Sequence, residues 1–366
     1  MRLMTLGPLF VGTLLAPLAA DAVERATQSG PVEVTQIVTG LDMPWALAFL
    51  PDGSTLVSEK SGRLLRGVGG TMVPVSGVPQ VRDSGQGGLL DVMVPRDFAT
   101  SGEIFLSYAK PMAGGAGTAL FKGRLDLESN SLTGDDIFQM SQGSRAGQHF
   151  GSRIVEGADG TIYLTIGERG EGPLAQDLSR HNGKVVRINR DGSLPSDNPF
   201  VDTAKAQPDI WSYGHRNPQG AAMDASGQIW IAEHGAKGGD EINRLAKGAN
   251  FGWPEISFGT NYNGSGFAQG TAAQGMTQPQ FYWDPSMAPS GYAIATTSQI
   301  EDWQGDHFIG SLKFDYISHI DPDSWSEERL SWPETERVRD VVSAPDGTLW
   351  FISETRGAIF RISPSL

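Results

Sequence analysis

The chain has 366 residues, of which 39% are hydrophobic and 9% aromatic, so a sizeable core can form and a disordered or fibrous protein is not expected. Asp and Glu number 42 against 28 Lys and Arg, which gives a formal net charge of −14. An acidic chain repels nucleic-acid phosphates and anionic membrane surfaces, so neither is an expected partner. Cysteine is absent, which excludes disulfides, zinc–thiolate sites, iron–sulfur clusters and covalent c-type haem.

Residues 1–22 have the pattern of an export signal. Arg2 precedes an apolar run over residues 9–18, and Ala20-Asp21-Ala22 offers small residues for cleavage. The apolar run is too short to span a bilayer, and no other stretch approaches that length. We therefore expect a periplasmic or secreted protein without a membrane span. The alternative is that these residues form a buried N-terminal helix.

A short strand pattern recurs through residues 31–366, which predicts a single domain built of repeats. Asp-Gly turns precede three copies, at Asp52-Gly53, Asp159-Gly160 and Asp346-Gly347. Asp-Gly between strand-like runs is a strong hairpin signal. The six copies lie at residues 54–58, 103–107, 161–165, 228–232, 306–310 and 348–352.

Each copy has a strand-like partner on either side. The preceding partners are residues 45–49, 89–93, 151–155, 220–223, 292–295 and 339–342, and the following partners are 63–66, 119–122, 185–188, 241–244, 316–319 and 358–361. Six such meanders predict an all-β, six-bladed β-propeller. Residues 32–37 are expected to close the ring as the outer strand of the blade that ends at Arg361. The alternative is a pair of β-sandwiches, which the even spread of the meanders and the lack of a Pro/Ser linker disfavour.

The unusual residues gather at one end of the predicted blades. In an antiparallel meander the start of the first strand and the finish of the second lie at the same end, here called the top. First strands line the axis of a propeller, so their starts converge on one pocket. Four cations fall at this end of the blades: Arg216, Arg337 and Arg339 at the starts of first strands, and Lys313 at the finish of a second strand. Such a pocket suits a ligand with several carboxylates or phosphates, unless each cation pairs with an acid of a neighbouring blade.

The remaining motifs narrow the chemistry. Residues 85–88 (Gly-Gln-Gly-Gly) lack the Lys-Ser/Thr of a phosphate loop, so a nucleotide is disfavoured. His149, at the start of a first strand, is the best candidate for a general base. The chain has no Gly-x-Ser-x-Gly and no His-Glu-x-x-His motif. The glycine-bearing loop 233–241 combines carbonyls with carboxylates, which suits Ca²⁺, although a solvated turn would have the same composition.

Together these segments resemble the soluble PQQ-dependent sugar dehydrogenases. The matching runs follow one another in order from about residue 34 to residue 364: residues 85–90, 148–149, 151–153, 214–220, 233–243, 252–254, 311–313 and 337–340. Short loops between the blades make the chain more similar to the aldose sugar dehydrogenase branch than to the longer glucose dehydrogenase. The resemblance implies a six-bladed propeller that carries pyrroloquinoline quinone (PQQ) and Ca²⁺ on its top face.

The resemblance also implies a ligand set. PQQ is a flat ortho-quinone with three carboxylates, and the residues expected to contact it are Arg216, Asn217, Ser286, Lys313, Arg337, Arg339 and Ser353. The backbone carbonyls of Gly235 and Ala236 would bind a Ca²⁺ ion together with PQQ, and this ion would act as a Lewis acid. A second Ca²⁺ ion is expected near Asp240, Glu241 and the Phe251 carbonyl.

The implied reaction is oxidation of an aldose at C1 to the lactone. His149 would remove the proton of the anomeric hydroxyl while a hydride passes to the quinone, and an external acceptor would later take the electrons. Gln86 and Asn217 are expected to contact the sugar. Two rival functions are a metal-dependent lactonase-type propeller, which would want several axial carboxylates, and a non-catalytic ligand-binding propeller.

Three positions depart from the family pattern. Gln148 stands where the glucose enzyme has an acid before its base, so the sequence does not explain what orients His149. Ala236 replaces a proline, which leaves the carbonyl available, and Ser286 replaces a threonine, which keeps a hydroxyl. The short loops predict an open pocket and broad aldose specificity. No apolar helix or zipper predicts an obligate partner, so a monomer is expected, with a dimer as the alternative.

Overall fold

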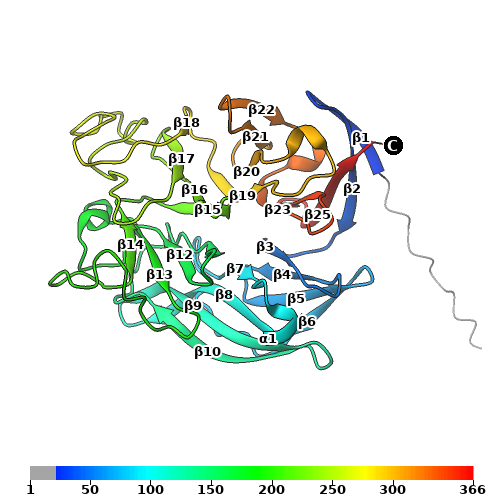
Figure 1. Ribbon diagram of the computed structural model, residues 1–366, viewed down its shortest axis with the longest axis horizontal. Coiled ribbons are helices and arrows are strands. Elements are labelled where there is room, and N and C mark those ends of the chain that lie inside the picture. The colour runs from blue at the N-terminus through cyan, green and yellow to red at the C-terminus, as the bar shows by residue number, and fades with distance from the viewer. Residues whose placement is uncertain (1–21, 366) are drawn as a thin grey trace, which may run out of the picture.

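The computed structural model describes residues 22–365, so nearly all of the predicted export signal lies outside the described residues. Six antiparallel sheets stand around a central axis as the blades of a propeller (Figure 1). The predicted all-β, six-bladed propeller is therefore confirmed. Among residues 22–365, no helix is long and apolar enough to cross a membrane.

Blades 1 to 5 are four-stranded meanders that follow one another along the chain. Blade 1 consists of β3 (Pro44–Phe49), β4 (Thr55–Glu59), β5 (Arg63–Val68) and β6 (Thr71–Val75), and blade 2 of β7 (Leu89–Met93), β8 (Glu103–Met112), β9 (Gly115–Asp126) and β10 (Ser131–Gln139). Blade 3 consists of β11 (Ile154–Glu156), β12 (Ile162–Ile166), β13 (Lys184–Ile188) and β14 (Ile210–Tyr213). Blade 4 consists of β15 (Pro218–Met223), β16 (Ile229–Glu233), β17 (Asp240–Arg244) and β18 (Phe281–Trp283), and blade 5 of β19 (Pro289–Ile294), β20 (His307–Ser311), β21 (Ile317–Asp321) and β22 (Ser326–Leu330). The helical turns are α1 (Phe98–Ser101), η1 (Gly172–Gln176), η2 (Glu301–Trp303) and η3 (Pro333–Thr335).

Blade 6 closes the ring by pairing the two ends of the chain. It holds β23 (Val338–Ser343), β24 (Leu349–Ser353) and β25 (Ala358–Pro364), followed by β2 (Gly30–Val38) and β1 (Ala22–Thr27). β2 runs antiparallel to β25, with Val34 opposite Ile362, which confirms the predicted closure. β1 adds a fifth strand that the sequence pattern did not predict. The pairing satisfies strand edges that would otherwise be open where the first and last blades meet.

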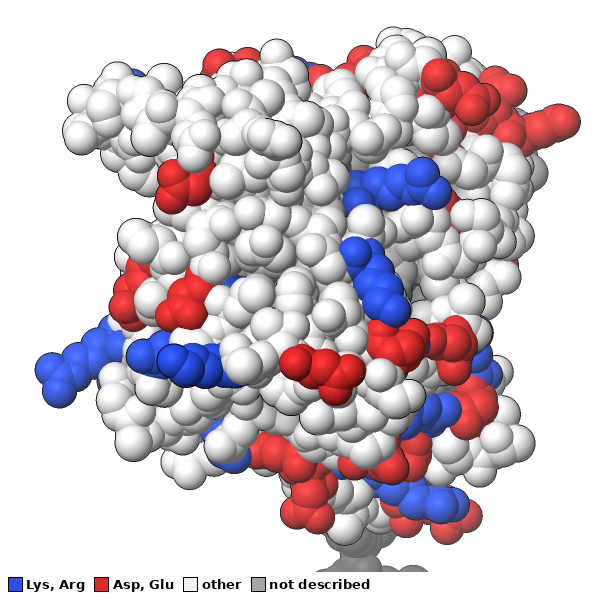
Figure 2. All heavy atoms as spheres, turned by 60° about the vertical axis from the view of Figure 1, so that its left-hand side comes forward, with Lys and Arg blue, Asp and Glu red and all other residues white. Residues whose placement is uncertain are grey.

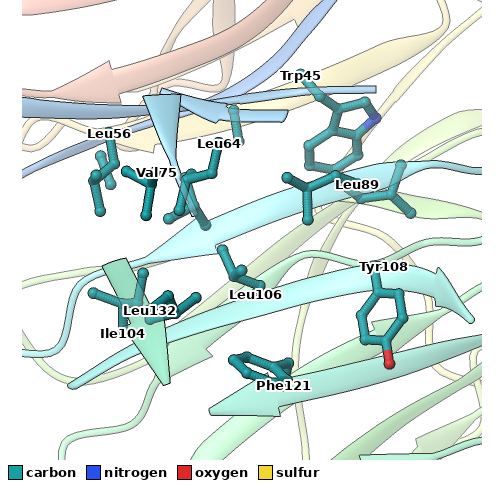
Figure 3. Packing of buried hydrophobic residues seen from close by; sticks show 14 of the residues in the cluster. Trp45, Leu56, Leu64, Val75, Leu89, Ile104, Leu106, Tyr108, Phe121 and Leu132 are labelled. Carbon is teal, nitrogen blue, oxygen red and sulfur yellow. The ribbon is translucent and has the colours of Figure 1, made fainter. Parts of the chain in front are cut away.

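The hydrophobic core consists of six clusters, each between two neighbouring blades. Between blades 1 and 2, Leu56 and Leu64 pack against Leu89 and Leu106 (Figure 3). A blade is covered on both faces, so its inner strands are buried along their whole length, as in β12. The first strands β3, β7, β11, β15, β19 and β23 contact one another in sequence around the axis. Their starts therefore converge, as the sequence predicted.

A buried ionic cluster crosses the axis below the top pocket. The guanidinium of Arg153 has three partners. Its Nη1 donates to Asp91 at 2.9 Å, and its Nη2 lies 3.1 Å from Asp340. Its Nε donates to the Gln219 carbonyl at 3.0 Å. These residues come from different blades, so the cluster joins the inner strands. A cavity of about 360 Å³ lies on its other side, lined by the later residues of the first strands. The cluster separates this bottom cavity from the top pocket.

Candidate functional site at the top of the axis

The top ends of the blades surround a cavity of about 120 Å³ on the axis. Its lining residues are Met43, Trp45, Lys60, Gly85, Gln86, Gln219, His234, Leu312, Arg337, Arg339 and Glu354. Blade 3 reaches the same place through His149, whose backbone N–H donates to Gln86 Oε1 at 2.7 Å. The structure thus brings together the predicted residues Gln86, His149, Arg337 and Arg339. On the face drawn in Figure 2, by contrast, acidic and basic side chains are interspersed, several of them side by side, between large uncharged areas.

Two of the four predicted cations share one carboxylate. Arg337 Nε lies 2.7 Å from Glu354 Oε1, and Arg339 Nε lies 2.5 Å from Glu354 Oε2. Burial alone would raise the pKa of the Glu354 carboxyl, but Arg339 and Arg337 outweigh it and hold the pKa below its usual value. The alternative in which each cation has its own acid is therefore wrong for this pair. Glu354 belongs to the same blade as both arginines, and one positive charge is left over.

The other two cations have no acidic partner among the described residues. The Lys313 ammonium lies 4.8 Å from the Phe314 ring centroid, and the Arg216 guanidinium lies 5.2 Å from the Trp253 ring centroid. Within residues 22–365, Arg216 Nε and the neighbouring Asn217 Nδ2 are buried without a hydrogen-bond partner. Buried donors without acceptors are costly, so these atoms favour a ligand that accepts hydrogen bonds. Arg216 lines a small neighbouring cavity together with His234, which also lines the axial cavity.

His149 is held by a carboxylate from its own blade. Its Nδ1 lies 2.5 Å from Glu168 Oε1. Because a carboxylate accepts, Nδ1 carries the proton and the lone pair of Nε2 is free. Burial lowers the pKa of His149, and the charges of Arg216 and Arg169 lower it further, while Glu168 opposes them. The imidazole is therefore neutral at pH 7 and can accept a proton.

Glu168 is the acid that orients His149 in the absence of an acid at position 148. The acid that orients His149 comes from the finish of β12, not from the residue before the base. The loops can approach this closely because residue 167 is glycine: a Cβ there would collide with the His149 carbonyl. Sequence analysis did not predict this pair. The signal was present, since the start of a first strand and the finish of the second strand of one blade lie side by side at the top.

Asp240, predicted as a ligand of a second Ca²⁺ ion, anchors the glycine-bearing loop. Its Oδ1 accepts from the Gly235 N–H at 2.7 Å, and its Oδ2 accepts from the Ala288 N–H at 2.8 Å and from Ser286 Oγ at 2.9 Å. The carboxylate is fully buried and joins blade 4 to blade 5. Ser286 is predicted to contact the cofactor, but its hydroxyl donates to Asp240 instead. Ala236 is buried in the glycine-bearing loop.

Two carboxylates lie close together beside this loop. Glu233, Glu241 and Phe251 line a small cavity of about 20 Å³. Burial raises the pKa of the Glu241 carboxyl to about 8, and the charge of Glu233 adds to the rise. Among residues 22–365 no three His, Asp or Glu side chains form a metal-type cluster, so a cation here would also need backbone carbonyls as ligands.

The hydroxyls of Ser353 and Ser212 form hydrogen bonds within the protein. Ser353, predicted to contact the cofactor, donates to the Glu336 carbonyl at 2.6 Å and is fully buried. Ser212 Oγ lies 2.8 Å from His215 Nε2, and His215 Nδ1 lies 2.9 Å from Glu233 Oε1. This arrangement resembles a hydrolase triad, but Ser212 and His215 are fully buried. Substrate cannot reach the serine, so the set holds Glu233 in place.

Sequence comparison identifies the class to which this propeller belongs. The family of glucose/sorbosone dehydrogenases matches residues 41–361, and the chain belongs to this family. The resemblance found in the sequence is thereby confirmed.

Individual relatives lie on both sides of the aldose–glucose division. The chain is 41% identical over 364 residues to the aldose sugar dehydrogenase YliI of Escherichia coli, a match that covers 96% of this chain and 98% of that protein. It is 27% identical to quinoprotein glucose dehydrogenase B of Acinetobacter calcoaceticus, with 89% and 76% covered.

Solved structures agree with this assignment. The apo-form of the soluble aldose sugar dehydrogenase from Escherichia coli matches with a TM-score of 0.86 at 39% identity, covering 91% of this chain and all of that one, 100%. The PQQ-bound aldose sugar dehydrogenase from Streptomyces coelicolor matches with a TM-score of 0.75 at 25% identity, covering 94% and 99%.

Proposed function

We propose that this protein is a PQQ- and Ca²⁺-dependent aldose dehydrogenase, which oxidises sugars at C1 to the lactone and passes the electrons to an external acceptor. The observation that carries the proposal is a neutral histidine, fixed by Glu168, beside a cationic pocket whose buried donors lack acceptors. The aldose sugar dehydrogenase of Escherichia coli, 41% identical over nearly the whole chain, supports the same assignment.

The residues of the pocket fit PQQ. Three carboxylates and two quinone oxygens need several donors and cations, and Lys313, Arg337, Arg339, Arg216 and Asn217 supply them. Arg216 Nε and Asn217 Nδ2 have no other partner within residues 22–365, so a bound acceptor would satisfy both. When bound, PQQ supplies the acceptor for two electrons from the sugar. Ser286 and Ser353 use their hydroxyls elsewhere and would support the site from behind.

The protein's own groups handle the proton. His149 Nε2 takes the proton of the anomeric hydroxyl, and Glu168 stabilises the imidazolium that results. Gln86 Oε1 already accepts from the His149 backbone N–H, which leaves its amide Nε2 to donate to a sugar hydroxyl. Asn217, adjacent to the base through its bond to the Gly151 N–H at 3.1 Å, would contact cofactor and sugar alike.

The glycine-bearing loop would hold calcium through the carbonyls of Gly235 and Ala236. Asp240 fixes this loop from below, so the carbonyls are positioned before any ion arrives. A second Ca²⁺ ion would take Glu241 and the Phe251 carbonyl as ligands, with Glu233 lining the same cavity. A cation there would relieve the repulsion between the two carboxylates. In this arrangement Asp240 supports the site through the loop.

The test is to mix the purified protein with PQQ and CaCl₂, add a panel of aldoses, and follow reduction of an artificial dye. We expect sugar-dependent reduction that requires both additions and extends over several aldoses. A single sugar preferred a thousandfold would contradict the expected breadth. No reduction, together with no binding in a PQQ titration, would overturn the proposal and favour a binding propeller. A lactonase is less favoured, because the axial carboxylates Asp91 and Asp340 are already paired with Arg153.

The cellular location and the oligomeric state of the enzyme stay predictions. An export signal at residues 1–22 would place it in the periplasm or outside the cell, as a monomer or a dimer. Cell fractionation would show the location, and sedimentation of the purified protein would show the oligomeric state.

A further inference from the structure

A buried arginine lies directly behind the general base. Arg169 follows Glu168 in the loop after β12, and none of its surface is exposed. Its Nη1 donates to the Gln148 carbonyl and its Nη2 donates to the Ala146 carbonyl at 2.6 Å. Its guanidinium lies 3.4 Å from the centroid of the Phe150 ring. Arg169 therefore contacts the chain on both sides of His149.

The position of Arg169 is costly for the fold. No carboxylate among residues 22–365 lies within ion-pair distance of its guanidinium, and within that range its Nε has no hydrogen-bond partner. Burial lowers the pKa of Arg169 to about 10, although Glu168 and Glu171 oppose the shift. A buried cation held mainly by neutral carbonyls is rare, because losing its hydration destabilises the folded state. Stability alone does not account for a guanidinium here.

The backbone that Arg169 holds is unusual. His149 has φ of 56°, in the left-handed region that side chains rarely adopt, and Ser152 has φ of 86°. Such a conformation persists only when its surroundings hold it firmly. Gln86 fixes the His149 N–H, and Arg169 fixes the two carbonyls before it. The imidazole reaches Glu168 only while this segment keeps its shape.

Several charged or titratable groups surround the imidazole. The charged or titratable groups around His149 are Glu168 and Arg169 from the loop after β12, Arg216 from the start of blade 4, and His234 from the finish of β16. Arg169 and Arg216 disfavour the imidazolium, whereas Glu168 favours it. Adjacent residues of one loop thus act on the base in opposite directions.

We propose that Arg169 is a positioning residue for the general base, which holds residues 146–148 in the shape that presents His149 to Glu168. This inference rests on the proposed function of the same site. A purely structural arginine would stabilise the loop without affecting the contact between His149 and Glu168.

The variant Arg169→Met removes both carbonyl contacts. In the apo-protein, NMR titration of the imidazole signals, assigned with His149→Ala, would give the protonation midpoint of His149. Glu168 raises the pKa of His149, so we expect Glu168→Gln to lower this midpoint in the otherwise wild-type protein. In an Arg169→Met background the same substitution should change the midpoint little, because His149 no longer contacts Glu168. An equal shift in both backgrounds would overturn the proposal.

Turnover provides the second readout. In the presence of PQQ and Ca²⁺, Arg169→Met should lose roughly 10- to 100-fold in kcat, the size of effect that follows a displaced catalytic group. PQQ affinity should stay within about threefold of wild type, because the cations near the top of the axis remain. The matched control is Arg66→Met, a buried arginine of blade 1 that also donates to a carbonyl, that of Leu127 at 2.8 Å. It should leave kcat and the pH profile unchanged, and the same loss in both variants would overturn the proposal.

The two hypotheses fail in different ways. If wild type oxidises no aldose, the proposed function is wrong, but the NMR titration of the apo-protein still tests Arg169. If Arg169→Met does not fold, Arg169→Gln carries the test: it keeps a polar amide, but its shorter side chain does not span the Gln148 and Ala146 carbonyls, so kcat should fall. Wild-type kcat in Arg169→Gln would then overturn the proposal.

Discussion

The middle and the top of the propeller axis differ in how their charged groups are paired. Below, Arg153 lies between Asp91 and Asp340, and these carboxylates also accept from the N–H groups of Ile154 at 2.7 Å and Leu47 at 3.0 Å. Above, Arg216 and Lys313 have no acidic partner within residues 22–365, and buried donors lack acceptors. Charged groups whose hydrogen bonds and ion pairs are all made within the protein stabilise the fold. Buried charged groups that lack such partners indicate a site for a ligand.

The largest effect should come from the base at the top. His149→Ala removes the group that takes the proton, so kcat should fall by about 10²–10⁴-fold. PQQ affinity should change little, because the cations of the pocket remain. Steady-state dye reduction and a PQQ titration would measure the two quantities. A kcat within a few-fold of wild type would remove His149 from the mechanism.

The next effect should come from the completed cluster below. Arg153→Met leaves two carboxylates buried without a cation and should lower the free energy of unfolding by about 3–5 kcal/mol, as measured by urea denaturation. Arg66→Met is the matched control. Its acidic partner Asp52 is 39% exposed and can be hydrated, so the loss should be smaller. Equal losses in the two variants would contradict the view that the cluster on the axis is a fully buried and fully paired unit.

A third comparison separates an unpaired from a paired cation near the top of the axis. Lys313→Ala should weaken PQQ binding by about 1.5–3 kcal/mol, or roughly 10- to 150-fold in Kd, if a charge-assisted bond is lost. Lys60 lines the axial cavity but is paired with Asp83, so Lys60→Ala should weaken binding less. Fluorescence titration of both variants with PQQ would show the order. The reverse order would mean that Lys313 does not face the cofactor.

The smallest effect concerns pH. The pKa of His149 in the folded protein lies below its ordinary value, so activity should be lost as pH falls through that lowered pKa. Glu168 raises the pKa against this trend, and Glu168→Gln should therefore move the acidic limb of kcat/KM to still lower pH. The maximum rate should also fall, since Nδ1 loses its strongest acceptor. A limb displaced to higher pH would show that Glu168 does not act through His149.

Much of the site could be predicted because it follows from blade geometry. Gln86, His149, Arg337 and Arg339 each stand at the start of a first strand, and propeller topology alone sends them to the axis. Which acid pairs with which cation could not be predicted in the same way. Glu354 was equally placed to serve several cations, and only side-chain packing made it the shared partner of Arg337 and Arg339.

Positions assigned by resemblance needed the tertiary structure most. Asp240 and Ser286 lie 46 residues apart, and their bond joins two blades, so no local pattern predicts it. Ser353 is bound to a carbonyl of its own blade, behind the pocket. Each carries a functional group suited to a ligand, yet in each case this group forms a hydrogen bond within the protein.

The sequence by itself determined the number of blades, the order of their strands and the end at which the site lies, because Asp-Gly turns and alternating apolar residues act over a few neighbours. Only the tertiary structure decided which carboxylate orients His149, which cations stay unpaired, and why Arg169 is buried behind the base. These depend on contacts between loops that the chain brings together from different strands and blades, where distance and burial decide between partners of equal chemistry.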